Sequence, residues 1–380
     1  MIEYAALLLP LAAASGWFFA SKYYGPNESI SKIDQTVYFQ GLNYLLNEKT
    51  DKAIDVFIDL LEVDNETVGV HMALGSLFRK QGEVEKAIRL HQNLIARPEL
   101  DPRTRFEILN ELGMDYMNAG LLDRAETLFL ELEKNKYPKK NHIKQLLSIY
   151  QQEKEWDKAI EYANKFEDLG HQKKGILLAQ LNCELAEEAV SDNNLTAARS
   201  YLKKALKLNS LCVRASTLSA VLCMKEGQYK LALKFWEEVK NQNISFVPVY
   251  IDSVLSCFDK LGMKKEKLNF LSKIVNKFES PVLTQHFILL LKEQNGYDQA
   301  YSYAKEKLLL QPDLNNLSMF ANISNRHHVD NDLNLLLDLF SKLHQNKIAY
   351  HCTNCGFDSD SLHWCCPSCK SWDTVKTVIH

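Results

Sequence analysis

Two pairs of cysteines near the end of the chain have the spacing of a metal site. Cys352 and Cys355 form one C-x-x-C pair, Cys366 and Cys369 form a second, and ten residues separate the pairs. Each pair makes a tight turn, or knuckle, that directs two thiolates toward one ion, so the four together suit a single tetrahedral ion. Zinc and iron both accept four thiolates in this geometry. The sequence therefore predicts one iron or zinc ion bound by these cysteines.

Neighbouring side chains offer alternative ligands. Cys365 directly precedes Cys366, and His351 and His363 lie beside the predicted site. The C-P-S-C spacing favours Cys366 as the ligand and leaves Cys365 as a spare thiol. Four further cysteines lie among apolar positions at helical spacing and are expected to be core residues: Cys183, Cys212, Cys223 and Cys257. An odd total of nine cysteines, with C-x-x-C pairs, indicates a reducing compartment rather than a disulfide framework.

The element that must position the four thiolates is short. Residues 346–380 form the predicted metal-binding domain, which is too small to fold by apolar burial alone, so the ion is expected to supply most of its folding free energy. Gly356 follows the first pair and permits the turn there. The domain's aromatic residues are expected to wrap the site: Tyr350, Phe357, Trp364 and Trp372.

The long middle of the chain is a helical repeat. Between residues 33 and 345 apolar residues recur at three- and four-residue spacing, interrupted by short polar turns such as Gln81-Gly82-Glu83. Small and aromatic residues recur with an offset of 34, as when Gly41 and Ala53 are aligned with Gly75 and Ala87. Later copies carry alanine at the same position: Ala125, Ala159, Ala198, Ala232 and Ala300.

This pattern resembles the tetratricopeptide repeat, a pair of helices in which small residues let the two backbones approach closely. The range 33–345 has room for about eight or nine such pairs. The pattern weakens over residues 245–290, where Lys267 stands at the alanine position. A stack of repeats forms a superhelix whose inner wall binds peptides or protein surfaces. Polar residues on first helices are candidates for that wall: Arg79, Lys80, Asn110 and Asn118.

The start of the chain differs from the rest. Residues 4–21 contain no charged side chain, and as a helix this stretch would just span a bilayer. We therefore expect a transmembrane anchor at 1–21 and a linker at 22–32. Glu3 precedes the apolar stretch, whereas Lys22 and Lys32 follow it, which predicts that the bulk of the chain lies on the cytoplasmic side.

Composition limits the remaining functions. The chain has 380 residues, 45 Lys+Arg and 48 Asp+Glu, for a net charge of −3, which argues against a nucleic-acid-binding protein. It lacks the phosphate-loop, dinucleotide-binding, zinc-protease and serine-hydrolase motifs, so an enzyme is not expected.

Anchor, repeats and knuckles occur in the order found in the lipopolysaccharide assembly protein B family of Gram-negative bacteria, which the whole chain resembles. The match is most specific at the rubredoxin-like end: Cys352, Cys355, Gly356, Trp364, Cys366, Pro367, Ser368, Cys369, Trp372 and Thr374. Rubredoxins have a longer gap between the pairs and a glycine where this chain has Lys370, which argues against electron transfer.

The resemblance implies an all-α, single-pass inner-membrane adaptor of tetratricopeptide repeats with a rubredoxin-like four-cysteine domain. Its implied role is to promote degradation, by a membrane-bound FtsH-type AAA+ protease, of the deacetylase that commits precursor to lipid A. A membrane-embedded regulator is a further implied partner, and self-association is left open. Two alternatives remain: a membrane-tethered, rubredoxin-like electron carrier and a general chaperone-docking repeat module.

Overall fold

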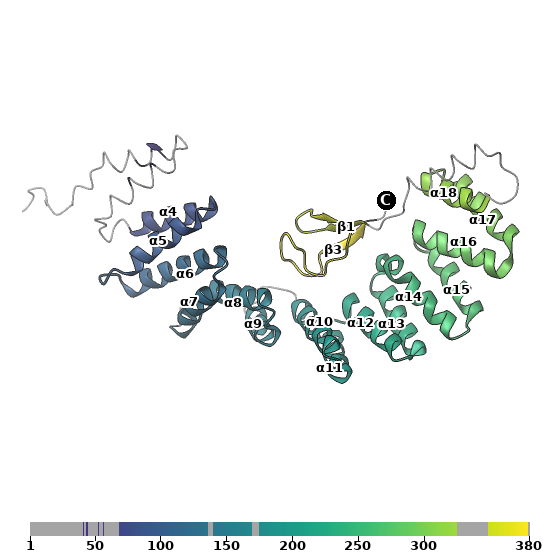
Figure 1. Cartoon of the computed structure of the whole chain (residues 1–380), viewed down its shortest axis with the longest axis horizontal. Helices are drawn as coiled ribbons and strands as arrows, with labels where there is room; N and C mark the ends of the chain where they lie inside the picture. The colour runs from purple at the N-terminus through teal and green to yellow at the C-terminus, as the bar shows by residue number, and fades with distance from the viewer. Residues whose placement is uncertain are drawn as a thin grey trace, which may run out of the picture. The chain divides into compact units, whose positions relative to one another are not determined.

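The computed structural model describes residues 41, 43–44, 52, 56, 68–135, 140–168, 175–324 and 349–378 (Figure 1). The anchor predicted at 1–21 and the linker at 22–32 lie outside these residues. Within the described ranges, no helix is both long enough and apolar enough to span a membrane.

Fifteen α-helices make up most of the described chain. They are α4 (Val68–Lys80), α5 (Val84–Ile95), α6 (Pro102–Asn118), α7 (Leu122–Lys134), α8 (Lys140–Gln152), α9 (Trp156–Asp168), α10 (Ile176–Ser191), α11 (Leu195–Leu208), α12 (Val213–Lys225), α13 (Tyr229–Gln242), α14 (Val247–Lys260), α15 (Lys264–Val275), α16 (Pro281–Asn295), α17 (Tyr297–Leu310) and α18 (Leu314–Ser324). A short 3₁₀ helix, η1 (Ile244–Phe246), precedes α14.

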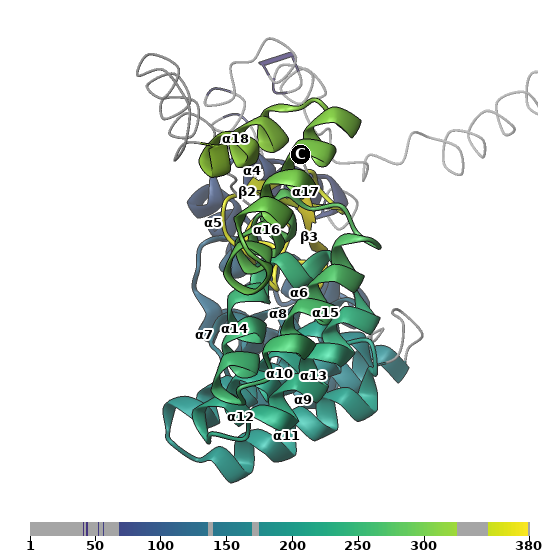
Figure 2. The same cartoon turned by 90° about the vertical axis from the view of Figure 1, so that its right-hand side faces the viewer.

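In chain order these helices alternate as first and second helices from α4 to α17, followed by α18. Six pairs of consecutive helices are in contact: α4 with α5, α8 with α9, α10 with α11, α12 with α13, α14 with α15, and α16 with α17. Figure 2 shows α16, α17 and α18 in front. The expected turns are present. Gly82 and Gly120 both have positive φ, and the residue after each donates its N–H to a carbonyl of the preceding helix, Phe78 or Tyr116. Such a left-handed residue ends a helix and reverses the chain at little cost when it is glycine. The tetratricopeptide fold is therefore confirmed for the described residues.

The recurring alanines mark where helices touch. All six alanines of the ladder that lie in the described chain are completely buried: Ala87, Ala125, Ala159, Ala198, Ala232 and Ala300. Lys267, at the same position in the weakest repeat, directs its Nζ to Asp259 Oδ1 at 2.7 Å. Because a lysine stem can lie along apolar surface while its ammonium reaches solvent, α14 and α15 still pair there.

The chain divides into two compact units, residues 1–128 and 129–380. In the first unit, Gly75 on α4 faces His91 on α5, and a Cβ at Gly75 would lie 2.5 Å from the His91 ring. His91 therefore occupies the place of the large aromatic residue of the repeat. Its Nδ1 lies 2.5 Å from the buried Asp115 on α6.

The second unit contains the remaining repeats and a small antiparallel sheet. Its strands are β1 (Ala349–Cys352), β2 (Asp358–Ser359) and β3 (Val375–Val378), in the order β2-β1-β3. Cys352 lies opposite Val375, so the last residue of β1 is the first cysteine of the predicted site. We call residues 349–378 the ribbon.

Candidate metal centre

The four predicted cysteines come together at one end of the ribbon. One sulfur from each lies within 4.8 Å of the others. The Sγ atoms are 3.8 Å apart between Cys352 and Cys369, and 3.7 Å apart between Cys355 and Cys366. Zinc and iron bind thiolates at about 2.3 Å, so sulfurs this close suit one tetrahedral ion.

Both knuckles use the same backbone turn. The N–H of Cys352 donates to the carbonyl of Phe357 at 2.8 Å, and that of Cys366 donates to Ser371 at 2.9 Å. In each knuckle the residue four positions on returns its N–H to the cysteine carbonyl, at 2.9 Å from both Gly356 and Lys370. Two copies of one turn thus present four sulfurs to a common centre.

Lys370 therefore does not distort the second knuckle. Its φ is 57°, in the left-handed region that Gly356 occupies with φ 78°. A side chain there costs free energy because Cβ approaches the carbonyl. The departure from glycine changes the energy of the turn and leaves its shape intact.

Hydrogen bonds around the sulfurs favour negative charge. Cys352 Sγ lies 3.3 Å from the hydroxyl oxygen of Thr374, and this contact lowers the pKa of that thiol. Ser371, followed by Asn354, lowers the pKa of Cys369 to about 5. At Cys355 the N–H of Phe357 favours the thiolate, but desolvation and the other three sulfurs raise the pKa to about 11. Four adjacent thiolates repel one another, so this donor set fits a cation that holds them together.

The alternative ligands point elsewhere. The thiol of Cys365 lies 3.5 Å from the carbonyl oxygen of Lys370, and Cys365 pairs with Trp372 in an isolated bridge. His351 Nδ1 lies 2.7 Å from Asp358, and His363 contacts two serine hydroxyls. None of the three belongs to the sulfur cluster. The four scattered cysteines are buried in the repeats, as expected.

The ribbon's tryptophans pack on the repeats, which the sequence did not predict. Trp364 stacks on Phe246 of η1, with ring centroids 5.7 Å apart and planes at 13°. Trp372 donates its Nε1–H to Gln151 of α8 at 3.4 Å. The hydroxyl of Thr377 donates to the carbonyl of Ser245 at 3.1 Å. Of the four aromatics expected to wrap the site, only Tyr350 is buried within the ribbon's own core, with Phe357 packed against it.

A buried arginine of the repeats, Arg214, lies against Trp372 of the ribbon. Arg214 on α12 has a side chain only 4% exposed, and its Nη2 lies 2.8 Å from Glu184 and 2.9 Å from Glu187 on α10. Its guanidinium carbon is 5.9 Å from the centroid of the Trp372 ring. The available sequence signal that this face is covered was that α12, apart from Arg214 and Lys225, is apolar or small all round, which is unusual for a helix with one face in solvent.

The residues predicted to line the groove have different environments. Arg79 is held by Glu111 and Asp115 on α6, with Nη–O distances of 2.6 and 2.7 Å. Asn118 is exposed and donates to the carbonyl of Met114 on its own helix. Lys80 is exposed and Asn110 is half-buried. Arg79 is therefore part of an ion-pair network that joins two repeats.

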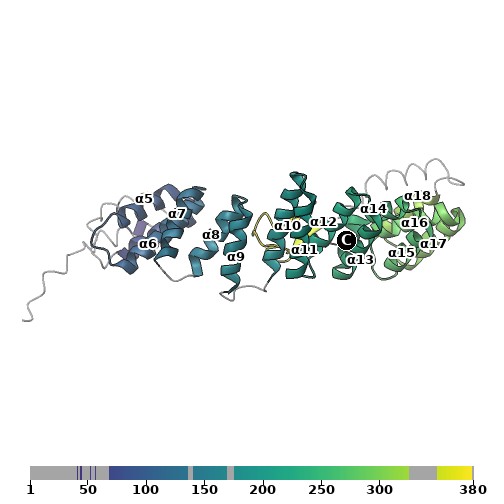
Figure 3. The ribbon, with the colours of Figure 1, turned by 90° about the horizontal axis from the view of Figure 1, so that it is seen from below.

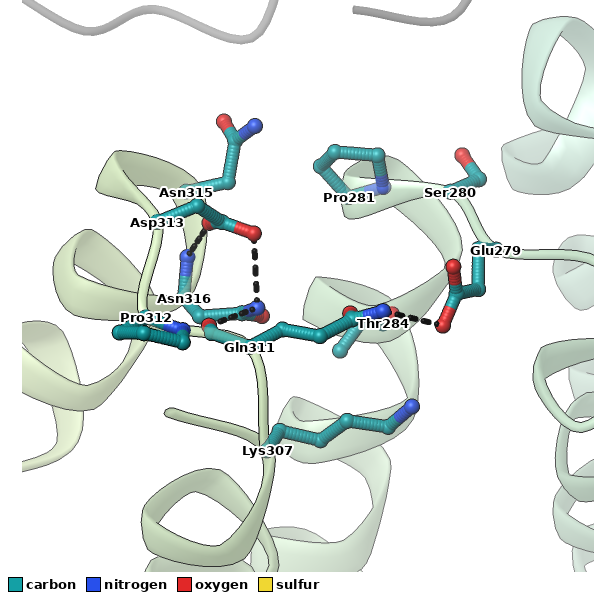
Figure 4. A pocket seen from close by; sticks show the side chains of 10 residues that line it. All are labelled: Glu279, Ser280, Pro281, Thr284, Lys307, Gln311, Pro312, Asp313, Asn315 and Asn316. Carbon is teal, nitrogen blue, oxygen red and sulfur yellow. Dashed lines mark hydrogen bonds between the residues drawn. The ribbon is translucent and has the colours of Figure 1, made fainter. Parts of the chain in front are cut away.

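A polar pocket of about 490 Å³ lies between the last repeats of the second unit (Figure 4). Its walls carry Glu279, Ser280, Pro281, Thr284, Lys307, Gln311, Pro312, Asp313, Asn315 and Asn316. Gln311 donates to Glu279 at 2.9 Å, and Asn316 is bonded to Asp313. Much of its hydrogen-bonding capacity is thus used within the wall, and it brings together no set of groups with evident chemistry.

Comparison with known proteins identifies the family. A family model described as a rubredoxin metal binding domain matches residues 350–377, and tetratricopeptide-repeat models match 70–105 and 183–241. Lipopolysaccharide assembly protein B of Escherichia coli strain K12 is 32% identical over 100% of this chain and 98% of its own length. The chain belongs to the lipopolysaccharide assembly protein B family. The Haemophilus influenzae member is 33% identical over the same shares.

Among solved structures, a tetratricopeptide repeat protein from Parabacteroides merdae covers 73% of this chain and 99% of its own, at 15% identity and a TM-score of 0.35. The full-length match to the Escherichia coli relative confirms the family resemblance seen in the sequence, and the four-cysteine site lies within the matched metal-binding domain.

Proposed function

We propose that this chain is an inner-membrane adaptor in lipopolysaccharide assembly, which promotes degradation of the lipid A pathway deacetylase by an FtsH-type AAA+ protease. The observation that carries the proposal is the full-length match to relatives named lipopolysaccharide assembly protein B. The repeat fold supports a binding role, since stacked helix pairs present extended surfaces to other proteins. The protein has no catalytic role in this proposal.

Attachment to the membrane is part of the proposed mechanism. Residues 1–21 confine the chain to the protease's membrane, with the bulk on the cytoplasmic side. Holding protease and deacetylase close together raises the effective concentration of one near the other without any new contact between them. A membrane-embedded regulator acts through the same anchor.

In this proposal the metal ion has a structural role, with Cys352, Cys355, Cys366 and Cys369 as its ligands. The ion closes the two knuckles and so fixes the ribbon, whose Trp364 and Trp372 contact the repeats. Since the ribbon is too small to fold without it, metal binding also determines whether this part of the repeat wall is covered.

The test is the half-life of the deacetylase in cells that carry the full-length protein, no protein, or a variant. We expect the deacetylase to accumulate without the protein, with Cys352→Ser and with residues 1–21 deleted. Cys365→Ser is the matched control, because this thiol lies outside the sulfur cluster. A deacetylase half-life that is the same with and without the protein would refute the proposal.

A rubredoxin-like electron carrier is the second candidate, favoured by the two equivalent knuckles and by the exposure of Cys355. It requires bound iron with a reversible potential. Metal analysis and voltammetry of the protein purified from its native cells show whether it holds such iron. Replacing the iron with zinc then separates the two candidates, because an adaptor retains its effect on the deacetylase and an electron carrier does not.

A further inference from the structure

Three consecutive second helices of the repeat array are strongly basic. Helix α11 has four cationic residues and no acidic one, α13 has three lysines and two glutamates, and α15 has four lysines and one glutamate. Together they hold eleven cations and three carboxylates, although the whole chain has a net charge of −3. By contrast, the earlier second helix α7 has four carboxylates and two cations. The positive charge is therefore concentrated in one part of the chain.

Most of these cations are exposed and have no ion pair among the described residues. Arg199 pairs with Glu226 of the next repeat, and Lys240 and Lys267 pair with carboxylates of their own repeats. The others make up what we call the basic outer face: Lys203, Lys204, Lys207, Lys230, Lys234, Lys264, Lys265 and Lys273. On a protein surface, exposed cations without neutralising carboxylates create a positive potential that attracts polyanions.

The fold brings these lysines to one side of the second unit. The buried residues of α11, which are Ala198, Leu202 and Ala205, face the repeat core and leave its lysines outward. Figure 3 shows α11, α13 and α15 following one another along the stack. The ribbon's hydrogen bonds and ring contacts within the described residues are to α8, α12 and η1, and its core also packs against Val249 of α14. None of these segments carries a lysine of the basic outer face.

The form of the surface identifies its partner. Its charges are spread over three helices, which suits an extended anionic surface better than a single phosphate group. Next to Lys207, Leu208 is 36% exposed and Leu211 is 66% exposed. Lysines bordered by exposed leucines are typical of segments that lie at the headgroup and acyl boundary of a bilayer. Protein-binding surfaces instead centre on aromatic side chains, and the large exposed apolar residues of these helices are leucines.

We infer that the basic outer face binds the surface of an anionic phospholipid bilayer. The lysines contact the lipid phosphates, and the loop after α11 places Leu211 among the headgroups. This contact is distinct from the predicted anchor at 1–21, since it orients the repeats against the bilayer instead of only tethering them. It also leaves the ribbon side of the second unit available to protein partners.

The test is amine-reactive labelling of the full-length protein in nanodiscs, read lysine by lysine by mass spectrometry. Nanodiscs of phosphatidylcholine alone are compared with nanodiscs that also contain phosphatidylglycerol. We expect the labelling rate of Lys203, Lys204 and Lys207 to fall about threefold or more in the anionic nanodiscs, and the protection to disappear at high salt. Lys80 and Lys144, exposed on first helices, serve as control lysines whose rates stay unchanged.

A charge-reversal variant tests whether the lysines act together. Changing Lys203, Lys204 and Lys207 to glutamate is expected to abolish the protection of Lys230 and Lys234, while the double change Lys80→Glu/Lys144→Glu leaves it in place. All changed residues are exposed, and circular dichroism confirms that the helices remain. Equal labelling in both lipids, or equal protection of the control lysines, would overturn the inference. Protection seen only in native membranes would overturn it in favour of an acidic protein partner.

Discussion

The two knuckles of the metal centre share a left-handed backbone conformation, at a glycine in one and at a lysine in the other. Gly356 and Lys370 both have positive φ, and a Cβ at Gly356 would meet no atom within 4 Å. Only the left-handed backbone therefore determines the effect of exchanging them. We expect Gly356→Ala to destabilise the ribbon by about 1 kcal/mol, and Lys370→Gly to stabilise it by up to about 1 kcal/mol. The measurement is the rate of metal loss to a chelator, which should rise in the first variant and fall in the second. The same direction of change in both would show that the turns are not equivalent.

Close contact between α4 and α5 leaves no room for a side chain at a second glycine, Gly75. A Cβ at Gly75 would lie 2.5 Å from the ring of His91, which is completely buried and bonded to Asp115. We expect Gly75→Ala to destabilise the first unit by about 2 kcal/mol, as overpacking does. Gly69, on the same helix, has no atom within 4 Å of its Cβ position, so Gly69→Ala should instead stabilise it by up to about 1 kcal/mol. Urea unfolding followed by hydrogen exchange in α4 and α5 measures both. Equal losses would contradict the close approach.

The ion pairs of Arg79 link α4 to α6. Without this guanidinium, Asp115, whose side chain is 0% exposed, loses one of its partners, so Arg79→Met should cost about 3 kcal/mol. Lys80→Met, one residue on and exposed, should change stability by less than about 0.5 kcal/mol. A similar effect of both changes in urea unfolding would show that the network adds nothing.

The same network predicts a dependence on pH. Burial opposes ionisation of Glu111, but the hydrogen bonds from Arg79 and Ser76 outweigh it and lower its pKa below the ordinary 4.5. As the pH falls, the Glu111 carboxylate therefore becomes protonated in the unfolded chain before it does so in the folded chain. The contribution of Glu111 to stability is complete above its ordinary pKa, and it is lost as the pH falls through the lower pKa of the folded chain. In Arg79→Met, the free energy of unfolding should therefore fall less steeply as the pH is lowered.

At the scale of elements, contacts with the ribbon should depend on metal. The stack of Trp364 on Phe246 and the contact of Trp372 with Arg214 both require a folded ribbon. We expect a chelator to raise hydrogen exchange about tenfold or more in η1 and the start of α12, since the ion supplies most of the ribbon's folding free energy. Helices α16 and α17 serve as the internal control and should not change. Protection of η1 that survives complete metal removal would contradict this prediction.

The elements differ in how far the sequence could predict them. Alanine and glycine spacing predicted the helix pairs, because backbone approach requires small residues whatever surrounds them. The C-x-x-C pairs predicted the sulfur cluster for a similar reason, since the ligands of each knuckle are local in sequence. The docking of Trp364 on Phe246 could not be predicted, because it joins residues more than one hundred positions apart. Likewise, no local pattern distinguishes Arg214, buried between two glutamates, from an ordinary surface arginine.

At the scale of the whole molecule, a repeat array predicts that perturbations stay local. Each repeat contacts only its neighbours, so stability is nearly a sum of repeat terms and neighbouring interfaces. Arg79 lies in the first compact unit and the metal centre in the second. We therefore expect the effects of Arg79→Met and Cys352→Ser on urea unfolding to be additive within about 0.5 kcal/mol in the double variant.

Metal content independently tests whether the effects of Arg79→Met and Cys352→Ser stay local. Arg79→Met should leave the metal content of the full-length protein unchanged, whereas Cys352→Ser should abolish it, in either background. A coupling of more than about 1 kcal/mol between the two changes would contradict local stability, since groups without shared partners rarely couple so strongly. It would mean that loss of metal is transmitted along the repeats, so that the ribbon affects surfaces well beyond the helices it covers.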